Sequence, residues 1–138
     1  MSDRTDTPEG GCFCGAIRYR VTAEPIARSI CHCRSCRLAS GAPSVAWAVF
    51  RPDDFSFTHG DPRRFESSPN VIRTFCGRCG TPLTYQHTGR PAAIDITTAS
   101  FDHPENFPPA KEIWTEHRIP WERVNESIPQ FPRSSLDT

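Results

Sequence analysis

The chain has 138 residues, a length typical of a single folded domain. Its 16 lysines and arginines balance its 16 aspartates and glutamates, so the formal net charge is zero. This balance argues against a protein that binds nucleic acid by neutralising phosphates, and against a polybasic membrane-binding segment. The sequence contains no apolar run of the roughly 18 residues that a membrane span needs, and its N-terminus has no apolar signal-peptide centre. We therefore expect a soluble, cytoplasmic protein without nucleic-acid or membrane partners.

Short strands dominate the expected secondary structure. Residues 1–9 are polar and are expected to be disordered. Alternating apolar and polar residues predict a strand at Ala16–Thr22, and the only predicted helical turn is Ser35–Ser40, closed by Gly41. The same alternation predicts the remaining strands, which are Val45–Phe50, Phe55–Thr58, Val71–Phe75, Leu83–Gln86 and Ala93–Thr97. Because turn signals separate these strands, the predicted fold class is mainly β, with an antiparallel sheet or a small sandwich.

The C-terminal segment is expected to be extended. From Pro104 onward it contains six prolines, which exclude a regular helix. Its large apolar residues predict a wrap that closes the core and buries them; they are Trp114, Ile119, Trp121 and Ile128. If the two tryptophans were exposed instead, they would offer a surface for a partner protein. The predicted domain covers residues 10–133, and residues 134–138 are expected to be loose.

Seven cysteines are the most informative excess in the composition. Their number is odd and the chain has no export signal, so metal binding is a better explanation than a disulfide framework. The cysteines form three clusters, Cys12-x-Cys14, Cys31-x-Cys33-x-x-Cys36 and Cys76-x-x-Cys79. Such short spacings bring thiolates within the reach of one metal ion, and zinc is the metal that we expect.

The first and third clusters predict one closed structural site. Cys76 and Cys79 form a zinc knuckle with adjoining glycines, and Cys12 and Cys14 form a tighter version that glycines also flank. Together they supply four thiolates, which complete a tetrahedral zinc site. Such a site would join distant strands and contribute directly to folding.

The middle cluster, Cys31, Cys33 and Cys36, predicts an open site. Three protein ligands and one free position are the arrangement of catalytic zinc. His32 lies between two ligands, but adjacent side chains in extended backbone point apart, so we do not expect it to bind the same ion. Other interpretations remain open: a different partition of the cysteines, an iron–sulfur cluster, or a structural site closed by a histidine from elsewhere, namely His59, His87, His103 or His117.

The charge of the open site indicates its chemistry. Zinc with three thiolates carries a formal charge of −1, so it is better suited to holding a substrate thiolate than to forming hydroxide. Arg34 and Arg37 could offset this charge or pair with a substrate carboxylate, or both could face solvent. Ser35 is expected to cap the short helix rather than to donate to a sulfur. Acid–base help would come from His32 or from a histidine that the fold supplies.

Three motifs resemble those of the glutathione-dependent formaldehyde-activating enzyme family, also called the centromere protein V/GFA domain. The resemblance runs from about Gly10 to about Pro132. The motifs are Gly11-Cys12-Phe13-Cys14-Gly15 with Tyr19, Cys31-His32-Cys33-Arg34-Ser35-Cys36-Arg37 with Gly41, and Phe75-Cys76-Gly77-Arg78-Cys79-Gly80-Thr81-Pro82-Leu83.

The resemblance implies an Mss4-like fold of antiparallel β-sheets around two zinc ions per chain. It assigns the structural zinc to Cys12, Cys14, Cys76 and Cys79, and the catalytic zinc to Cys31, Cys33 and Cys36. The founding activity of the family is condensation of formaldehyde with glutathione to S-hydroxymethylglutathione, which is classed as a carbon–sulfur lyase reaction. The expected function is thus a zinc-dependent carbon–sulfur lyase acting on a small thiol and a carbonyl compound or their adduct. The alternative is a zinc-stabilised binding or structural module without turnover.

Overall fold

The computed structural model describes residues 7–134. Within this range the chain forms ten strands, one α-helix and four short 3-10 turns. The strands are β1 (Glu9–Gly11), β2 (Arg18–Val21), β3 (Ala27–Cys31), β4 (Val45–Phe50), β5 (Phe55–His59), β6 (Arg63–Ser68), β7 (Val71–Phe75), β8 (Pro82–His87), β9 (Ile94–Thr97) and β10 (Lys111–Ile113). The helix is α1 (Arg34–Ser40), and the 3-10 turns are η2 (Pro52–Asp54), η3 (Thr98–Ser100), η4 (Pro104–Asn106) and η5 (Thr115–His117). No helix in residues 7–134 is long and apolar enough to span a membrane.

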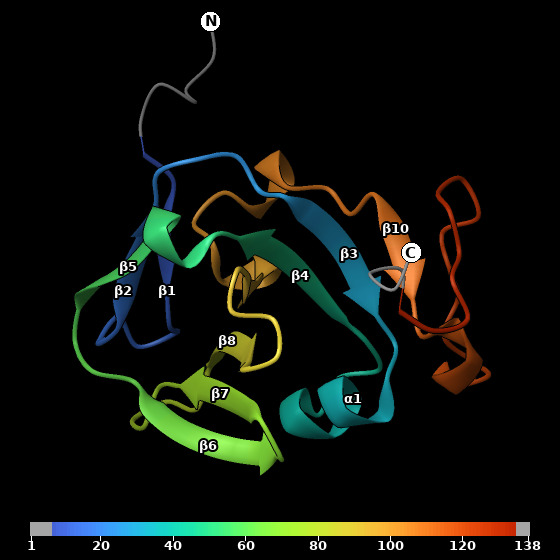
Figure 1. Cartoon of the computed structure of the whole chain (residues 1–138), viewed down its shortest axis with the longest axis horizontal. Coiled ribbons are helices and arrows are strands. Elements are labelled where there is room, and N and C mark those ends of the chain that lie inside the picture. Colours follow the sequence, from blue (N-terminus) through green and yellow to red (C-terminus); the bar gives the residue numbers. More distant parts are fainter. Residues whose placement is uncertain (1–6, 135–138) are drawn as a thin grey trace, which may run out of the picture.

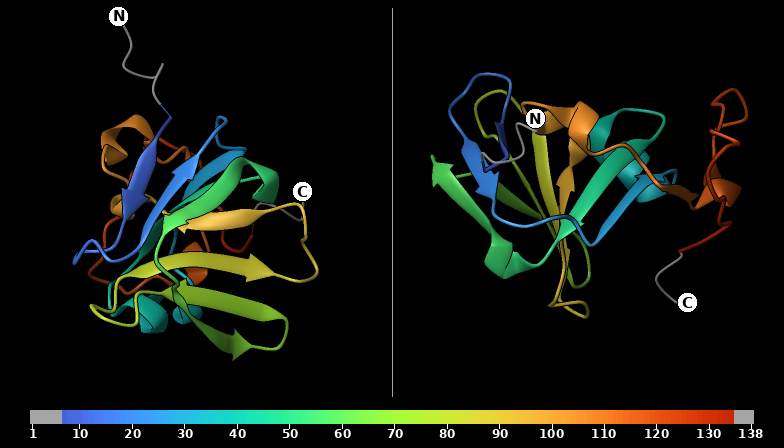
Figure 2. Two further views of the ribbon diagram at one scale, coloured as in Figure 1. Left: turned by 90° about the vertical axis from the view of Figure 1, so that its left-hand side faces the viewer. Right: turned by 90° about the horizontal axis from the view of Figure 1, so that it is seen from above.

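The strands form two sheets. The smaller sheet has the antiparallel order β1-β2-β5, and the larger has the order β10-β3-β4-β9-β8-β7-β6. All pairs in the larger sheet are antiparallel except β10 with β3. The smaller sheet and the tail that follows β10 lie at opposite ends of the molecule (Figures 1 and 2). The predicted mainly β fold of antiparallel sheets is therefore confirmed, with one parallel pair added.

The main core lies between the two sheets. Apolar residues of β4, β8 and β9 on one face of the larger sheet pack with Tyr19 and Val21 of β2. Phe101 and Phe107 contact each other and the Phe50 ring, with centroids 4.5–6.1 Å apart, and so extend this core beyond the strands. Burial of these large side chains supplies the main driving force for folding.

The opposite face of the larger sheet carries both polar and apolar residues. Val49, Asp95, Tyr85, Arg73 and Phe65 lie directly opposite one another across β4, β9, β8, β7 and β6. Directly paired residues project from the same face of a sheet. This row faces away from the main core, because the alternate positions of β4, β8 and β9 supply that core.

All six predicted strands are present within three residues of their expected ends, but four further strands escaped prediction. β1 and β10 have only three residues each, β6 is almost entirely polar, and β3 (ARSIC) ends in Cys31, a metal-ligand candidate. β1 begins at Glu9, which pairs with Arg20. Of the predicted disordered segment, residues 1–6 lie outside the described residues.

The prediction that the C-terminal tryptophans are both buried is wrong. Trp121 is 70% exposed, whereas Trp114 is half-buried and packs against the Cys31–Cys36 cluster. The tail is extended, as expected, and runs beside β10: the Phe131 N–H donates to the Glu112 carbonyl, and the Glu112 N–H donates to the Pro129 carbonyl. It covers a sheet edge rather than the main core, which leaves Trp121 without a surface to pack on. Of the predicted loose end, residues 135–138 lie outside the described residues.

Candidate active site and metal centres

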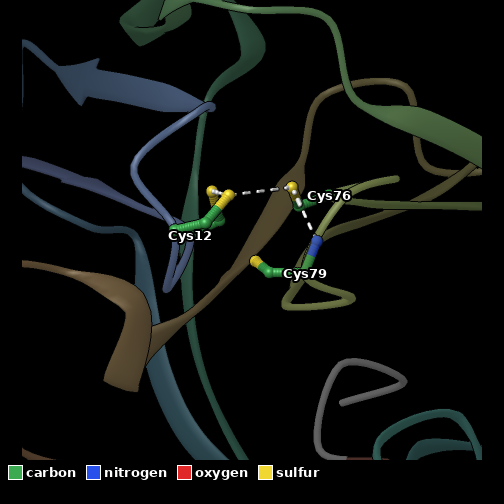
Figure 3. Close-up of side chains that lie close together, drawn as sticks. Cys12, Cys76 and Cys79 are labelled. Carbon is green, nitrogen blue, oxygen red and sulfur yellow. Dashed lines mark hydrogen bonds between the residues drawn. The ribbon is translucent and has the colours of Figure 1, made fainter.

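Two loops from different sheets bring four cysteines together. Cys12 and Cys14 lie in the loop between β1 and β2, and Cys76 and Cys79 lie in the loop between β7 and β8. All four sulfurs lie within 4.8 Å of one another, and the Cys14 sulfur lies 3.6 Å from that of Cys12 and 3.8 Å from that of Cys76. Figure 3 shows the side chains of Cys12, Cys76 and Cys79 converging on one space. These separations suit tetrahedral zinc, whose ~2.3 Å bonds to sulfur imply sulfurs roughly 3.8 Å apart.

Backbone N–H groups of the two loops point at these sulfurs. The Ile17 N–H donates to the Cys12 sulfur at 3.3 Å, and the Arg78 N–H donates to the Cys76 sulfur at 3.3 Å. The tight turn at Cys76 needs Gly80, whose φ of +86° is one that a side chain would strain. Hydrogen bonds with the Thr81 hydroxyl and backbone lower the pKa of the Cys79 thiol to about 5. The four cysteines therefore fit a closed metal site.

The second cluster forms where β3 ends and α1 begins. Cys31 is the last residue of β3, Cys33 is the N-cap of α1 and Cys36 lies in its first turn. Their sulfurs also lie within 4.8 Å of one another, and no fourth cysteine, histidine or carboxylate among residues 7–134 joins them. The three residues fit a metal site with three protein ligands and one free position. The seven cysteines thus group as the sequence analysis expected, and none of them forms a disulfide.

The N-terminus of α1 differs from prediction in its cap. The Cys36 N–H donates to the Cys33 sulfur at 3.3 Å, so Cys33 rather than Ser35 caps the helix. Hydrogen bonds from the Cys31 and Cys36 thiols, together with the charge of Arg73, lower the pKa of the Cys33 thiol. A ligand sulfur therefore doubles as the helix cap, which ties the geometry of the cluster to α1.

His32 points away from the cysteine cluster. Its side chain is 1% exposed, and its Nε2 contacts the Glu112 carboxylate of β10. The other oxygen of Glu112 accepts a hydrogen bond from the Asn125 N–H at 2.5 Å. His32 does not line the cavity beside the cluster, so the expectation that it does not bind the same ion agrees with its position. Its contacts join β3 to β10 and the tail.

A cavity of about 510 Å³ adjoins the three-cysteine cluster. Sulfur, basic, acidic and aromatic side chains line it, and they include Cys31, Cys33, Cys36, Arg34, Ser35, Arg73, Tyr85, His87, Arg90, Asp95, Trp114 and His117. Arg34 and Ser35 are exposed at its rim. Arg37 is half-buried, does not line this cavity, and its Nε has no hydrogen-bond partner among the described residues. The fold supplies His87 and His117 to the cavity, whereas His59 and His103 lie outside its lining.

Arg73 is the cation in contact with the cysteines, and sequence reasoning missed it. It is only 9% exposed, and its Nη2 lies 4.0 Å from the Cys36 sulfur. The guanidinium is held from two sides: its Nε donates to the Ser67 hydroxyl at 3.0 Å, and its Cζ lies 4.9 Å from the centre of the Tyr85 ring. The signal was present in β7, where alternation places this charge at a position that should be buried.

The carboxylate of Asp95 lines the same cavity, and its Oδ1 is buried. Its Oδ1 lies 3.8 Å from Arg90 Nη2 and has no hydrogen-bond partner among the described residues. Burial raises the pKa of Asp95 to about 6, although the charges of Arg90 and Arg73 oppose the shift. A buried acid that titrates near neutral pH, beside a candidate metal site, is a characteristic of catalytic sites. The alternation in β9 could have drawn attention to it.

Comparisons with known proteins agree with this architecture. A crystal structure of a Rhodobacter sphaeroides protein superposes with a TM-score of 0.57 and 18% identity, covering 88% of this chain and 98% of that one, which supports the fold. An uncharacterized lyase of Schizosaccharomyces pombe is 32% identical over 99 residues, or 72% of each chain. A Halomonas elongata protein, named provisionally as a glutathione-dependent formaldehyde-activating enzyme, is 26% identical over 84% of this chain and 80% of its own.

The family model described as glutathione-dependent formaldehyde-activating enzyme matches residues 7–117. This match spans all three cysteine clusters and most of the structure described above. The chain belongs to the glutathione-dependent formaldehyde-activating enzyme family.

Proposed function

We propose that this protein is a zinc-dependent carbon–sulfur lyase that joins a small thiol to a carbonyl compound or splits their adduct. The observation that carries the proposal is a cluster of three cysteines, without a fourth protein ligand in residues 7–134, beside a cavity that charged side chains line. The names of its relatives support a lyase and a glutathione-related reaction. We also place it in the cytoplasm, because seven free thiols suit a reducing compartment.

Two zinc ions per chain are part of this proposal. Cys12, Cys14, Cys76 and Cys79 would hold a structural ion, and Cys31, Cys33 and Cys36 would hold a second one with a free position. All-sulfur donor sets favour soft or borderline metals, among which zinc has no redox chemistry. When bound at the open site, zinc would supply a centre that stabilises the thiolate form of a substrate.

The cavity suits a thiol that carries carboxylates. Arg73 and Arg90 line it with one opposing charge, that of Asp95, while Arg34 stands at the rim. Guanidinium groups bind carboxylates through paired hydrogen bonds, and burial of Arg73 strengthens its charge interactions. Glutathione carries two carboxylates and is therefore the first candidate.

The reaction requires movement of one proton. The thiol loses its proton, the sulfur forms a bond to the carbonyl carbon, and the carbonyl oxygen takes up a proton as the C=O double bond becomes a single bond. Asp95 and His87 both line the cavity, and either side chain could accept the first proton and donate the second; burial raises the pKa of Asp95 to about 6, which suits this role.

The test is acceleration of adduct formation. Purified zinc protein is mixed with glutathione and formaldehyde, and exchange between free and bound formaldehyde is followed by NMR against a protein-free control, because the addition also occurs without enzyme. We expect acceleration that Cys33→Ser abolishes. Equal rates with wild type, Cys33→Ser and no protein would refute the lyase.

A zinc-stabilised binding module is the second candidate, and the exposed Trp121 favours it. At 70% exposure this ring offers an apolar contact on the tail. Binding of glutathione without turnover, together with capture of a partner that Trp121→Ala abolishes, would replace the enzyme with this function.

A further inference from the structure

A second cavity, of about 420 Å³, adjoins the three-cysteine cluster. It lies between α1 and strands β4, β7 and β8. Its walls are mostly apolar, and the side chains that make them so are Ala39, Val45, Trp47, Phe65, Phe75 and Pro82. This lining contrasts with the charged cavity described above.

The hydroxyl groups in its walls are already hydrogen-bonded within the protein. Thr74 and Thr84 share a hydrogen bond of 2.5 Å between their hydroxyls. The Thr97 hydroxyl donates to the Pro82 carbonyl at 2.9 Å, and the Ser40 hydroxyl donates to the Cys36 carbonyl at 2.8 Å. Because each of these hydroxyls already has a hydrogen-bond partner within the protein, the cavity offers more to an apolar group than to a polar one.

The two cavities meet at the proposed reaction centre. Cys36, Trp47 and Arg73 line both, and Arg73 Nη2 lies 4.0 Å from the Cys36 sulfur. A molecule that reacts beside the cysteine cluster can therefore extend its charged part into one cavity and an apolar part into the other.

The apolar cavity is too large for formaldehyde alone. Its volume lies in the range of small-molecule sites, roughly 300–1,000 Å³, whereas a molecule the size of water has about 30 Å³ of liquid volume. Formaldehyde has only two non-hydrogen atoms and would leave most of the cavity empty.

We propose that the carbonyl reactant carries an apolar substituent, a short alkyl chain or an aromatic ring, which occupies this cavity while its carbonyl carbon lies beside the three-cysteine cluster. This inference rests on the proposed lyase function and names its substrate class. The thiol would occupy the charged cavity, and the product would be the thiohemiacetal of the larger aldehyde.

The first test is a homologous series of aldehydes. Acetaldehyde, propanal, butanal and pentanal have similar carbonyl reactivity, so each is compared with glutathione against its own protein-free rate. Each methylene that enters the cavity should raise kcat/KM about threefold to fourfold, because burying a CH₂ group contributes ~0.8 kcal/mol. A flat series, with formaldehyde still accelerated, would overturn this inference and leave the lyase intact. No acceleration with any aldehyde would overturn both.

Two matched variants of α1 test whether the chain-length dependence arises in the apolar cavity. Ala39 is exposed at the rim and lines the apolar cavity, so Ala39→Phe places a ring in it without altering the sheet. Leu38 is 61% exposed and lines neither cavity, so Leu38→Phe adds a ring on the same helix outside both. Ala39→Phe should remove the chain-length dependence, while Leu38→Phe should keep it. Equal behaviour of the two variants would contradict the assignment.

A binding measurement supplies a readout that does not depend on turnover. 1-Pentanol is an unreactive probe with the same alkyl chain as pentanal, and saturation-transfer NMR detects its contact with the protein. We expect transfer to the alkyl protons with wild type and Leu38→Phe, and its loss with Ala39→Phe, at unchanged zinc content. Absence of transfer with wild type, or undiminished transfer with Ala39→Phe, would overturn the proposed binding of the apolar substituent.

Discussion

Arg73 and Asp95 show how single side chains shape the site. Tyr85 of β8 pairs directly with Arg73 of β7 on one side and with Asp95 of β9 on the other. Arg73 is a buried cation beside a sulfur, and Asp95 is a carboxylate whose buried Oδ1 lacks a hydrogen bond among the described residues. Neither belongs to a cysteine motif, so their roles follow from strand pairing alone.

Replacing Arg73 tests charge compensation at the thiol site. Arg73→Met keeps an apolar stem and removes the charge, so the affinity of the zinc protein for glutathione should fall roughly tenfold to a hundredfold, in line with the ~1.5–3 kcal/mol of a hydrogen bond to a charged group. Arg34→Met is the comparison, since Arg34 is exposed and solvent screens its charge; its effect should stay within about twofold. Calorimetric titration measures both, and equal losses would argue against a special role for Arg73.

The pKa of Asp95 predicts a dependence of stability on pH. Its pKa is about 6 in the folded protein and 3.8 ordinarily, so between these values the folded state binds more protons than the unfolded state. The contribution of Asp95 to the free energy of unfolding therefore falls as pH rises through this window, by at most roughly 3 kcal/mol, and is constant above it. In denaturant unfolding, the stability of Asp95→Asn relative to wild type should therefore increase as the pH rises from 5 to 7.

Asp102 is the matched control for this titration. Hydrogen bonds from Arg18 lower the pKa of Asp102, which is the opposite shift. Its contribution is present above the ordinary pKa and is lost as pH falls through the lowered value, so Asp102→Asn should be less stable than wild type throughout the same pH range. If the stabilities of Asp95→Asn and Asp102→Asn relative to wild type change in the same way with pH, burial of Asp95 is not the cause of the pH dependence.

At the scale of elements, β3, β10 and the tail depend on one buried carboxylate. Glu112 of β10 contacts His32 after β3 and accepts from the Asn125 N–H, and the parallel pair of β10 with β3 holds this contact in place. Apolar periodicity could not reveal it, because β10 has only three residues and lies in a proline-rich segment. The sequence therefore predicted the extended tail but not the contacts of Glu112 that hold it in place.

Removing this anchor should loosen the tail. Glu112→Ala leaves the buried His32 ring and the Asn125 N–H without their carboxylate partner and should lower the free energy of unfolding by about 3 kcal/mol. Glu116→Ala, which removes an exposed carboxylate paired with Arg133 at 3.0 Å, should cost less than about 1 kcal/mol. Hydrogen exchange should show the loss at residues 111–131. Comparable destabilisation by the two variants would mean that the buried Glu112 contributes no more to stability than the exposed Glu116.

At the scale of the whole molecule, the four-cysteine site connects the two sheets. It joins the loop of the smaller sheet to the β7–β8 loop of the larger one, across more than sixty residues of sequence. Closing contacts between such distant segments is entropically costly, and a metal there offsets that cost. The three-cysteine site, by contrast, spans only one strand end and one helical turn.

The two sites should therefore respond differently to mutation. Cys79→Ser opens the closed site and should lower stability by several kcal/mol, whereas Cys33→Ser should affect activity more than stability. Elemental analysis of protein purified without added metal should find two zinc ions per wild-type chain, and chelation should unfold it. Fewer than one zinc per chain, an iron–sulfur absorption band, or equal unfolding of both variants would refute this division.

The sequence by itself determined the cysteine clusters, the mainly β class and the family, because metal ligands at short spacing and strand alternation are local patterns. The short and polar strands β1, β6 and β10 needed tertiary partners, since their own residues carry no alternating signal. The exposure of Trp121 and the anchoring of Glu112 likewise depend on where the tail meets the sheet. Only the tertiary structure brought Arg73, Asp95 and the apolar cavity to the three cysteines, because strand order and register, not sequence proximity, decide which side chains share a face.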